Sequence, residues 1–349
     1  MFSKFRSLIF KIDPEIAHTL AIKALKLNLI TNFFDENKGD TMFETTLFGK
    51  KIDNPIGIAA GFDKNAEVYN SLFKLGFGFV EVGTVTPLKQ YGNPKPRVFR
   101  LVEDQALINR LGFNNLGYEN VSSRIRYNLP KGLLGINIGP NKDTKDRLGD
   151  YLMGLRNFYD IADYITINIS SPNTENLRNF HNETKLDELM NSIEKEKIKL
   201  KSKTPIVVKI SPDILDNQVN LISEIMLKYK VNAIIISNTT ENSRGKLQNI
   251  LKHQKGGLSG KPLEEKSNQL IAKFFNLLKG KIEIIGVGGV DSGKSAYEKF
   301  LAGANYVQLY TGMVFQGPNI VGKIKRELKE ILKSDGVTNF KEIIGKKHN

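Results

Sequence analysis

Hydrogen-bonding side chains are concentrated between Asn168 and Thr174, where the chain reads Asn-Ile-Ser-Ser-Pro-Asn-Thr. The alternating β-branched residues of Tyr164–Ile167 predict a buried strand that ends at this cluster. A strand tip that carries a hydroxyl, that of Ser171, between two amides indicates a functional site. The same residue types also end strands as simple Asx or Ser/Thr turns. Residues elsewhere in the chain are therefore needed to distinguish a functional site from a simple turn.

Similar polar groups follow other apolar runs of the sequence, and they suggest which molecules could bind. Carboxamides both donate and accept hydrogen bonds, so several of them suit a neutral imide-like ring, and a lysine suits a carboxylate attached to that ring. A lysine beside a phosphate-anchored cofactor also suits a flavin, because a cation stabilises the negative charge of the reduced form. The only acid near these groups is Asp63, which leaves glycosidase chemistry without its pair of carboxylates.

Eight short apolar runs alternate with helical material from residue 54 onward. Runs that are apolar on both faces predict parallel strands covered by helices, and eight of them predict an α/β fold, a (β/α)8 TIM barrel, with a doubly wound sheet as the alternative. Active sites of such barrels gather at the C-terminal ends of the strands. The runs are Ile56–Ala59, Phe79–Val82, Leu134–Ile138, Tyr164–Ile167, Ile206–Ile210, Ala233–Ile236, Ile282–Val287 and Tyr306–Leu309. The groups at their ends are Gly61 to Lys64, Thr84, Asn137, Asn168, Lys209, Asn238 with Thr239, Gly288 with Gly289, and Tyr310 with Thr311.

The last two units carry a glycine-rich signal for a phosphate group. Gly286-Val-Gly-Gly289 is followed by Asp291 at the start of a predicted helix, and Tyr310-Thr-Gly312 closes the eighth run. Loops after strands seven and eight commonly bind phosphate in barrels, because glycine lets backbone N–H groups approach the anion. Together with Gly256–Gly260, these loops would hold one phosphate group.

Residues 288–295 also satisfy the P-loop pattern of nucleotide hydrolases, with an apolar run before them and a predicted helix after them. Such an enzyme needs an aspartate at the tip of a neighbouring strand to hold magnesium, whereas the runs here end in asparagine, serine or tyrosine. The motif also lies late in the chain, with little sequence left to complete that kind of domain. We therefore interpret Lys294 as a solvent-facing helix residue and keep the hydrolase as an alternative.

Composition narrows the classes of chemistry. Without cysteine the chain has no disulfide, thiolate nucleophile or zinc–thiolate site, and its four histidines lack the spacing of metal ligands or of a triad, so no metal site is expected. The formal charge of +14 leaves a basic nucleic-acid-binding or surface-binding module as a further alternative. Because the lysines are spread along the chain without an aromatic-plus-basic motif, we expect no nucleic-acid partner. A membrane surface or an anionic substrate would satisfy the same charge.

Residues 1–40 are predicted to form a helical extension in front of a catalytic barrel that spans residues 41–349. Apolar residues between Phe2 and Ile12 share one helical face, and Asp13-Pro14 provides an N-cap and a first-turn proline for a second helix. The apolar run is too short and too basic for a signal peptide, and no apolar segment is long enough to cross a membrane. Such helices suit either the membrane interface or an ordinary docked position on the body.

Long stretches of the chain resemble the class 2, quinone-linked, dihydroorotate dehydrogenases nearly from end to end. Many matches in the correct order make the resemblance highly specific, although each alone would be weak. It implies oxidation of dihydroorotate to orotate in pyrimidine synthesis, with FMN reduced and then reoxidised by a membrane quinone. The matching stretches are Asp13–His18, Asn54–Lys64, Glu81–Pro87, Pro94–Leu101, Ile108–Asn115, Gly135–Gly139, Asn168–Thr174, Ser237–Thr240, Gly256–Pro262 and Ile285–Gly289.

The resemblance also implies roles for individual residues. Ser171 would be the base that takes the C5 proton while hydride leaves C6; family members with a soluble acceptor use cysteine there, and this chain has none. Arg100 and Tyr310 would lie on the quinone side. The residues implied to surround FMN are Ala60, Gly61, Lys64, Thr84, Asn137, Asn168, Lys209, Ser237, Gly260, Gly288, Gly289, Tyr310 and Thr311. Those implied to hold the substrate are Lys64, Asn109, Arg110, Leu111, Gly112, Phe113, Asn168, Asn173, Asn238 and Thr239.

The resemblance further implies that residues 1–40 form the quinone entrance and that the protein is a monomer bound peripherally at the cytoplasmic face of the cell membrane. Serine is a weak base unless it is shielded from water, so we infer that a loop closes over Ser171.

The sequence departs from the family pattern at two places. Glu175-Asn176 stands where Pro-Gly is usual, and Pro140 stands where lysine is common. Because proline and glycine set particular backbone angles, we expect the dynamics of this loop to differ.

Overall fold

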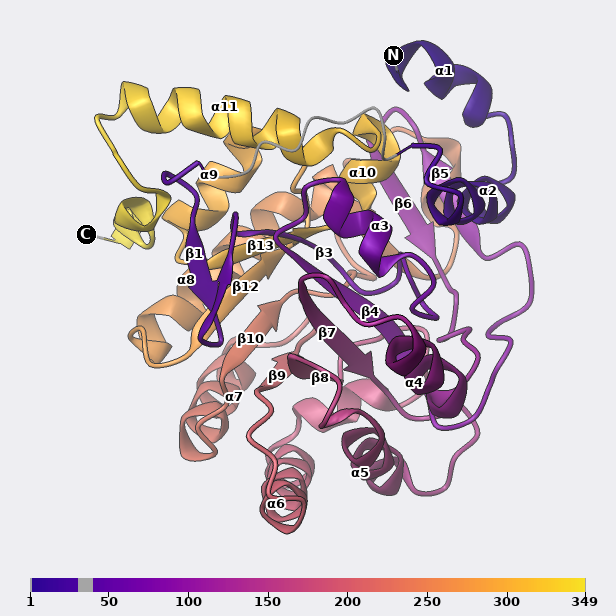
Figure 1. Cartoon of the computed structure of the whole chain (residues 1–349), viewed down its shortest axis with the longest axis vertical. Coiled ribbons are helices and arrows are strands. Elements are labelled where there is room, and N and C mark those ends of the chain that lie inside the picture. The colour runs from indigo at the N-terminus through magenta and orange to yellow at the C-terminus, as the bar shows by residue number, and fades with distance from the viewer. Residues whose placement is uncertain (1, 31–39, 349) are drawn as a thin grey trace.

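Strands rich in isoleucine and valine pair in parallel where both of their faces are covered, and eight of them close into a barrel in the computed structural model of this chain (Figure 1). The structure describes residues 2–30 and 40–348. In spatial order the barrel strands are β3 (Ile56–Ile58), β4 (Phe79–Val85), β7 (Leu133–Ile138), β8 (Tyr164–Asn168), β9 (Ile206–Lys209), β10 (Ala233–Ile236), β12 (Glu283–Val287) and β13 (Tyr306–Leu309). Because β13 pairs with β3, the ring is closed. The predicted barrel is therefore confirmed, and the doubly wound alternative is wrong.

Helices follow the strands and surround the barrel (Figure 1). Several begin at residues that satisfy free backbone N–H groups: Asp146 accepts from Gly149 N at 2.8 Å, and Ser292 and Ser295 form a capping box. The helices are α3 (Tyr69–Lys74), α4 (Tyr118–Tyr127), α5 (Arg147–Phe158), α6 (Glu183–Lys199), α7 (Asp216–Lys228), α8 (Glu264–Leu278), α9 (Gly293–Leu301), α10 (Thr311–Gln316) and α11 (Ile320–Ser334). Short 3-10 helices are η2 (Leu177–His181), η3 (Ile250–His253), η4 (Lys261–Leu263), η5 (Phe340–Ile343) and η6 (Lys346–His348).

Apolar side chains fill the end of the barrel at which the strands begin. Phe79, Tyr164 and Tyr306 pack there against a hairpin of two short strands, β1 (Thr45–Leu47) and β2 (Lys50–Ile52). The ring of Phe48 at the hairpin turn lies 5.4 Å from that of Tyr164, centroid to centroid. We call this group of residues the lower plug. It stabilises the barrel and leaves the opposite end for a site.

A three-stranded antiparallel sheet lies outside the barrel, in the order β11 (Gly257–Gly260), β6 (Ala106–Asn109) and β5 (Val98–Leu101). The sequence pattern does not predict this sheet. Its strands are four residues long, and β6 pairs with β11 although about 150 residues separate them. The pairing brings Asn109 opposite Gly257 and so joins two of the matching stretches in space.

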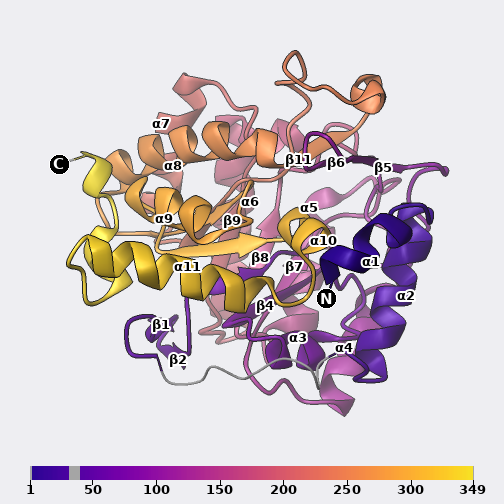
Figure 2. The same ribbon diagram turned by 90° about the horizontal axis from the view of Figure 1, so that it is seen from above.

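Two helices precede the barrel, as the sequence predicts: α1 (Phe2–Ile9) and α2 (Pro14–Lys26). Asp13 Oδ1 caps α2 by accepting from Glu15 N at 2.9 Å and Ile16 N at 3.1 Å. In Figure 2, α1 lies next to α10, and α2 runs along the side of the molecule. Within residues 2–30 and 40–348, no helix is both long enough and apolar enough to cross a membrane. The predicted boundary at residue 40 adjoins residues 31–39, which lie outside the described part of the chain.

Candidate active site

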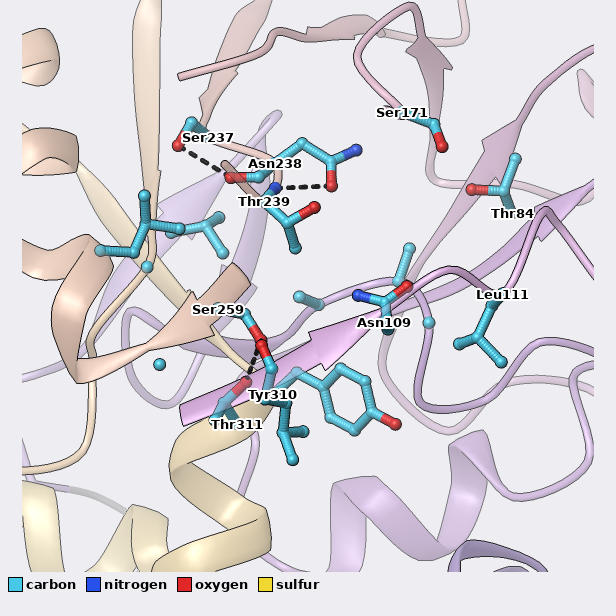
Figure 3. Close-up of a pocket in the computed structure, with 18 of the residues that line it drawn as sticks. Thr84, Asn109, Leu111, Ser171, Ser237, Asn238, Thr239, Ser259, Tyr310 and Thr311 are labelled. Carbon is cyan, nitrogen blue, oxygen red and sulfur yellow. Dashed lines mark hydrogen bonds between the residues drawn. The ribbon is translucent and has the colours of Figure 1, made fainter. Parts of the chain in front are cut away.

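A cavity lies at the C-terminal ends of the barrel strands and is bordered on one side by β5, β6 and β11. Its empty volume, counted together with the open mouth, is about 1140 Å³. Figure 3 shows hydroxyl and amide side chains gathered around it from several different strands. The predicted site residues that line it are Ala60, Gly61, Lys64, Thr84, Asn109, Leu111, Gly112, Phe113, Asn168, Ser171, Asn173, Lys209, Ser237, Asn238, Thr239, Gly260, Gly288, Gly289, Tyr310 and Thr311.

Three predicted residues lie outside the cavity wall. Asn137 is buried one layer beneath it, where its Oδ1 accepts from Thr84 Oγ1 at 2.6 Å. The Arg110 guanidinium turns towards neighbouring loops and donates to the Pro96 carbonyl at 2.8 Å. Arg100 donates to the carbonyls of Phe10 and Ile12, at 3.0 and 2.8 Å, and so fixes the turn between α1 and α2.

A buried hydrogen-bond network forms the cavity floor. Asn168 Nδ2 donates to Thr84 Oγ1 at 2.9 Å, and Asn168 Oδ1 accepts from Ser170 Oγ at 2.7 Å. Beneath them, Asn137 Nδ2 donates to Glu81 Oε1 at 2.8 Å. Because these amide groups have committed partners, their orientations are fixed before any ligand arrives.

Glu81 is the acid of the barrel interior, and no part of it is exposed. Its Oε2 accepts from Tyr164 OH at 3.0 Å, Thr166 Oγ1 at 3.1 Å and Gln308 Nε2 at 3.1 Å. A buried carboxylate needs this many donors to offset its lost hydration. Its signal in the sequence was an acid within the otherwise apolar run of β4, and we assigned no role to it.

Asp63, which the sequence indicates as the acid near the site, has a local structural role instead. Its two carboxylate oxygens accept from Glu67 N and Val68 N, each at 2.7 Å. Burial raises the pKa of this carboxyl, and Asp63 does not line the cavity. The expectation that it is the only nearby acid is therefore wrong, because Glu81 lies directly under the floor.

Ser171 belongs to the segment 169–176 that follows β8, which we call the serine loop. Its side chain is buried, and its Oγ accepts from Asn173 N at 3.2 Å. Figure 3 shows Ser171 and Thr84 on the same side of the cavity. The neighbouring Ser170 Oγ accepts from Asn238 Nδ2 at 2.8 Å, so the serine loop is joined to the segment after β10.

The departure from the family pattern at Asn176 has a simple conformational basis. Asn176 lies at φ 56° and ψ 10°, in the left-handed region that glycine adopts most easily. Asparagine is among the few other residues that adopt this conformation readily. The chain therefore makes the turn into η2 without the glycine that is usual in the family.

Two lysines line the cavity with different surroundings. Lys64 Nζ donates to the Gly61 carbonyl at 2.6 Å, and burial lowers the pKa of Lys64 to about 8. Burial also lowers the pKa of Lys209, while the charge of Glu81 opposes that decrease. The site therefore offers two amino groups in poorly hydrated surroundings to a ligand, and that of Lys64 is a cation at neutral pH.

Two buried side-chain oxygens in the wall, Asn114 Oδ1 and Thr239 Oγ1, have no hydrogen-bond partner within the described residues. Buried polar atoms are normally paired, so these two indicate where a polar ligand would complete the site. Thr239 was a predicted substrate residue. Asn114 was not, although it lies in a matching stretch.

Glycines and hydroxyls form the end of the cavity between β11, β12 and α10. Gly260, Gly288 and Gly289 have φ values of 97°, 112° and 80°, and a Cβ on Gly289 would lie 2.3 Å from the Glu264 Cβ. Ser259 Oγ lies 2.8 Å from Thr311 Oγ1 (Figure 3). Glycine backbone and hydroxyl groups along the cavity wall suit a phosphate group. Ser259 is a lining residue that we missed, and its signal was the one hydroxyl within Gly256–Gly260.

The P-loop alternative does not fit the structure. Lys294 is exposed on α9, as expected for a solvent-facing helix residue. Ser295 Oγ is within the capping box of the same helix, where it accepts from Asp291 N at 2.9 Å and Ser292 N at 3.0 Å. Neither Lys294 nor Ser295 lines the cavity.

Comparison with known proteins gives one consistent result. The sequence family described as dihydroorotate dehydrogenase matches residues 42–332. A "Dihydroorotate dehydrogenase (quinone)" of Bartonella tribocorum is 47% identical over 341 residues, which cover 97% of this chain and 94% of that protein. The mitochondrial "Dihydroorotate dehydrogenase (quinone)" of Mus musculus is 46% identical and covers 97% of this chain and 87% of its own length. A crystal structure of DHODH from Eimeria tenella in complex with ferulenol matches with a TM-score of 0.92 and 36% identity, over 97% of this chain and 96% of that one.

Proposed function

Since this chain belongs to the dihydroorotate dehydrogenase family, we propose that it oxidises dihydroorotate to orotate with a quinone as electron acceptor, in pyrimidine biosynthesis. The observation that carries the proposal is the cavity itself: a serine, several amides and two lysines converge there beside a glycine-rich end. The relatives whose names specify a quinone match 97% of the chain.

FMN is the cofactor that these residues fit. Gly260, Gly288 and Gly289, with the hydroxyls of Ser259 and Thr311, would hold its phosphate. Lys209, Thr84 and Asn168 would surround its ring above the floor network, together with Ala60, Gly61 and Ser237. When bound, FMN would supply a two-electron acceptor for the substrate and a donor for the quinone.

The opposite part of the cavity suits dihydroorotate. Asn109, Asn173 and Asn238 provide donors and acceptors for the ring amides, and Thr239 Oγ1 is a buried hydroxyl that lacks a partner among the described residues. Lys64 would hold the carboxylate, with the backbone of Leu111 to Phe113 beside it. Asn168 would orient both molecules, since its amide already has fixed partners.

Ser171 would remove the C5 proton as hydride leaves C6, which creates the double bond of orotate. A serine hydroxyl is a weak base, so its burial and the closure of the serine loop are required to keep water away. Asn173 N, 3.2 Å from Ser171 Oγ, can stabilise negative charge on that oxygen.

The N-terminal helices and the charge of the chain support a peripheral site at the cytoplasmic face of a membrane, from which quinone would enter. Tyr310 lines the cavity, and the ring of Phe62 between it and α2 lies 5.8 Å from Tyr310 and 5.3 Å from His18. Arg100 would act on this side by fixing the turn between α1 and α2. We assign residues 1–40 to this entrance, residues 41–349 to the catalytic barrel, and a monomer as the working state.

The test is anaerobic reduction of the bound flavin. We expect the purified protein to be yellow and to bleach on mixing with dihydroorotate, and Ser171→Ala to slow bleaching by at least about 100-fold at unchanged FMN content. Stopped-flow absorbance measures both. Near wild-type bleaching of Ser171→Ala would contradict the role of the serine. A colourless protein that takes up no added FMN would contradict the whole proposal.

A further inference from the structure

We propose that Arg178 is a positioning residue that holds the serine loop in its working place by tying it to the segment after β10. The inference rests on the proposed function, because it concerns the loop that carries the base. Arg178 lies in η2, directly after the serine loop, and does not line the cavity. It therefore acts through its neighbours and not by touching substrate.

The guanidinium of Arg178 joins two walls of the cavity. Its Nε donates to the Ser170 carbonyl at 3.2 Å, next to Ser171. Its Nη2 donates to the Thr239 carbonyl at 3.1 Å, next to Asn238. The planar guanidinium thus fixes the distance between the serine loop, which carries Ser171, and the segment after β10, which carries Asn238 and Thr239.

Asp213, which follows β9, holds the guanidinium from behind. Its Oδ2 lies 3.2 Å from Arg178 Nη1 and accepts from Glu241 N at 2.9 Å. Its Oδ1 accepts from Thr240 Oγ1 at 2.5 Å and from Lys266 Nζ. Burial by itself raises the pKa of Asp213, but these hydrogen bonds outweigh it and lower the pKa. The carboxylate stays charged at neutral pH and is fixed independently of Arg178.

The helix η2 has a second anchor that does not depend on the Arg178 side chain. His181 is buried, with Nδ1 2.8 Å from the Arg178 carbonyl oxygen and Nε2 accepting from Ser211 N at 3.2 Å. Burial lowers the pKa of His181 to about 4, so the ring is neutral and bonded on both sides at neutral pH. A change confined to the Arg178 side chain should therefore leave η2 folded.

Arginine is required at this position for its shape as well as its charge. A lysine carries one ammonium group and cannot reach the two carbonyls and the carboxylate together. Without the guanidinium and its hydrogen bonds to the two carbonyls, Ser171 would shift relative to Asn238 and Thr239. Displacements of about 1 Å at a reacting centre can cost a factor of about 100 in rate.

The experiment compares Arg178→Lys with wild-type holoenzyme. We expect anaerobic flavin reduction by dihydroorotate to slow at least 10-fold, whereas reoxidation of the prereduced flavin by a quinone changes less than 2-fold. Without any substrate, amide hydrogen exchange across residues 170–176 should become at least 10-fold faster, with the barrel strands unchanged. Asp213→Asn should move both readouts in the same direction by a smaller factor.

Glu241→Gln is the matched control. Glu241 Oε2 also lies 3.1 Å from Arg178 Nη1, but half of its side chain is exposed, so this pair should contribute little. Wild-type exchange and reduction rates in Arg178→Lys would overturn the proposal, and so would an equal loss in both half-reactions. A wild-type protein that dihydroorotate does not bleach would instead overturn the proposed function, while the exchange measurement would still test Arg178.

Discussion

Lys64, the proposed partner of the substrate carboxylate, has a displaced pKa. Burial lowers the pKa of Lys64 to about 8, so the ammonium is charged below that pH and neutral above it. Since kcat/KM reports the ionisation of the free enzyme, we expect kcat/KM for dihydroorotate to fall as pH rises above about 8. Steady-state rates between pH 6 and 10 measure it. In Lys64→Gln, kcat/KM should be lower at every pH and should no longer decrease above about pH 8. If the decrease persists in this variant, it comes from the ionisation of another group.

Glu81, beneath the cavity floor, leads us to a prediction about stability. Replacing Glu81 by alanine leaves four buried donors without their acceptor: Asn137, Tyr164, Thr166 and Gln308. We expect Glu81→Ala to lower the free energy of unfolding by at least about 3 kcal/mol, because unmet buried donors are costly. Urea unfolding measures the change. Glu224→Ala, at an exposed position of α7, should stay within about 0.5 kcal/mol of wild type.

Most of the cavity lining could be predicted, because strand-end polar residues are visible in a sequence and the family motifs overlap them. What could not be predicted are contacts between distant segments. Arg178 gains its role from Asp213, 35 residues away, and from the Thr239 carbonyl, 61 residues away. Glu81 reads in the sequence as an acid in an apolar run, and only the closed barrel brings its donors together.

At the scale of elements, the turn from the serine loop into η2 is set by one backbone conformation. Asn176 has φ 56°, which glycine adopts freely and alanine does not. We expect Asn176→Gly to leave the free energy of unfolding within a few tenths of a kcal/mol and Asn176→Ala to lower it by about 1 kcal/mol. Equilibrium denaturation of the two variants side by side measures the difference. Equal stability of the two variants would show that the left-handed conformation is not required.

The barrel strands could be predicted and the outer sheet could not, for a physical reason. Each barrel strand is covered on both faces, which leaves an unbroken apolar run in the sequence. In contrast, β5 contains the half-buried Arg100, and β11 consists of Gly-Leu-Ser-Gly, so neither has a clear hydrophobic period. Their pairing with β6 depends on the barrel that brings them together.

At the scale of the whole molecule, the N-terminal helices present apolar side chains to solvent. Leu8, Ile16 and Leu20 are 63%, 55% and 50% exposed. We expect the combined replacement of these three by glutamine to reduce binding to anionic phospholipid vesicles at least 10-fold, because apolar burial in the interface would be lost. Vesicle co-sedimentation measures it. The control is glutamine at two similarly exposed residues, Ile198 in α6 and Leu215 directly before α7. Both helices lie across the barrel from α1 and α2 in Figure 1, so these changes should have no effect. Equal losses would contradict a localised membrane face.

The lower plug has a consequence for access. Since Tyr164, Phe79, Tyr306 and the β1–β2 hairpin occlude the barrel axis, reactant, product and oxidant must all exchange through the opposite rim. The hairpin itself turns at Gly49, whose surroundings are open, and the next residue, Lys50, is exposed. A tether, fluorophore or carrier protein attached at this turn would hold the protein by the closed end of the barrel. Ligands could then still enter and leave the cavity at the opposite end.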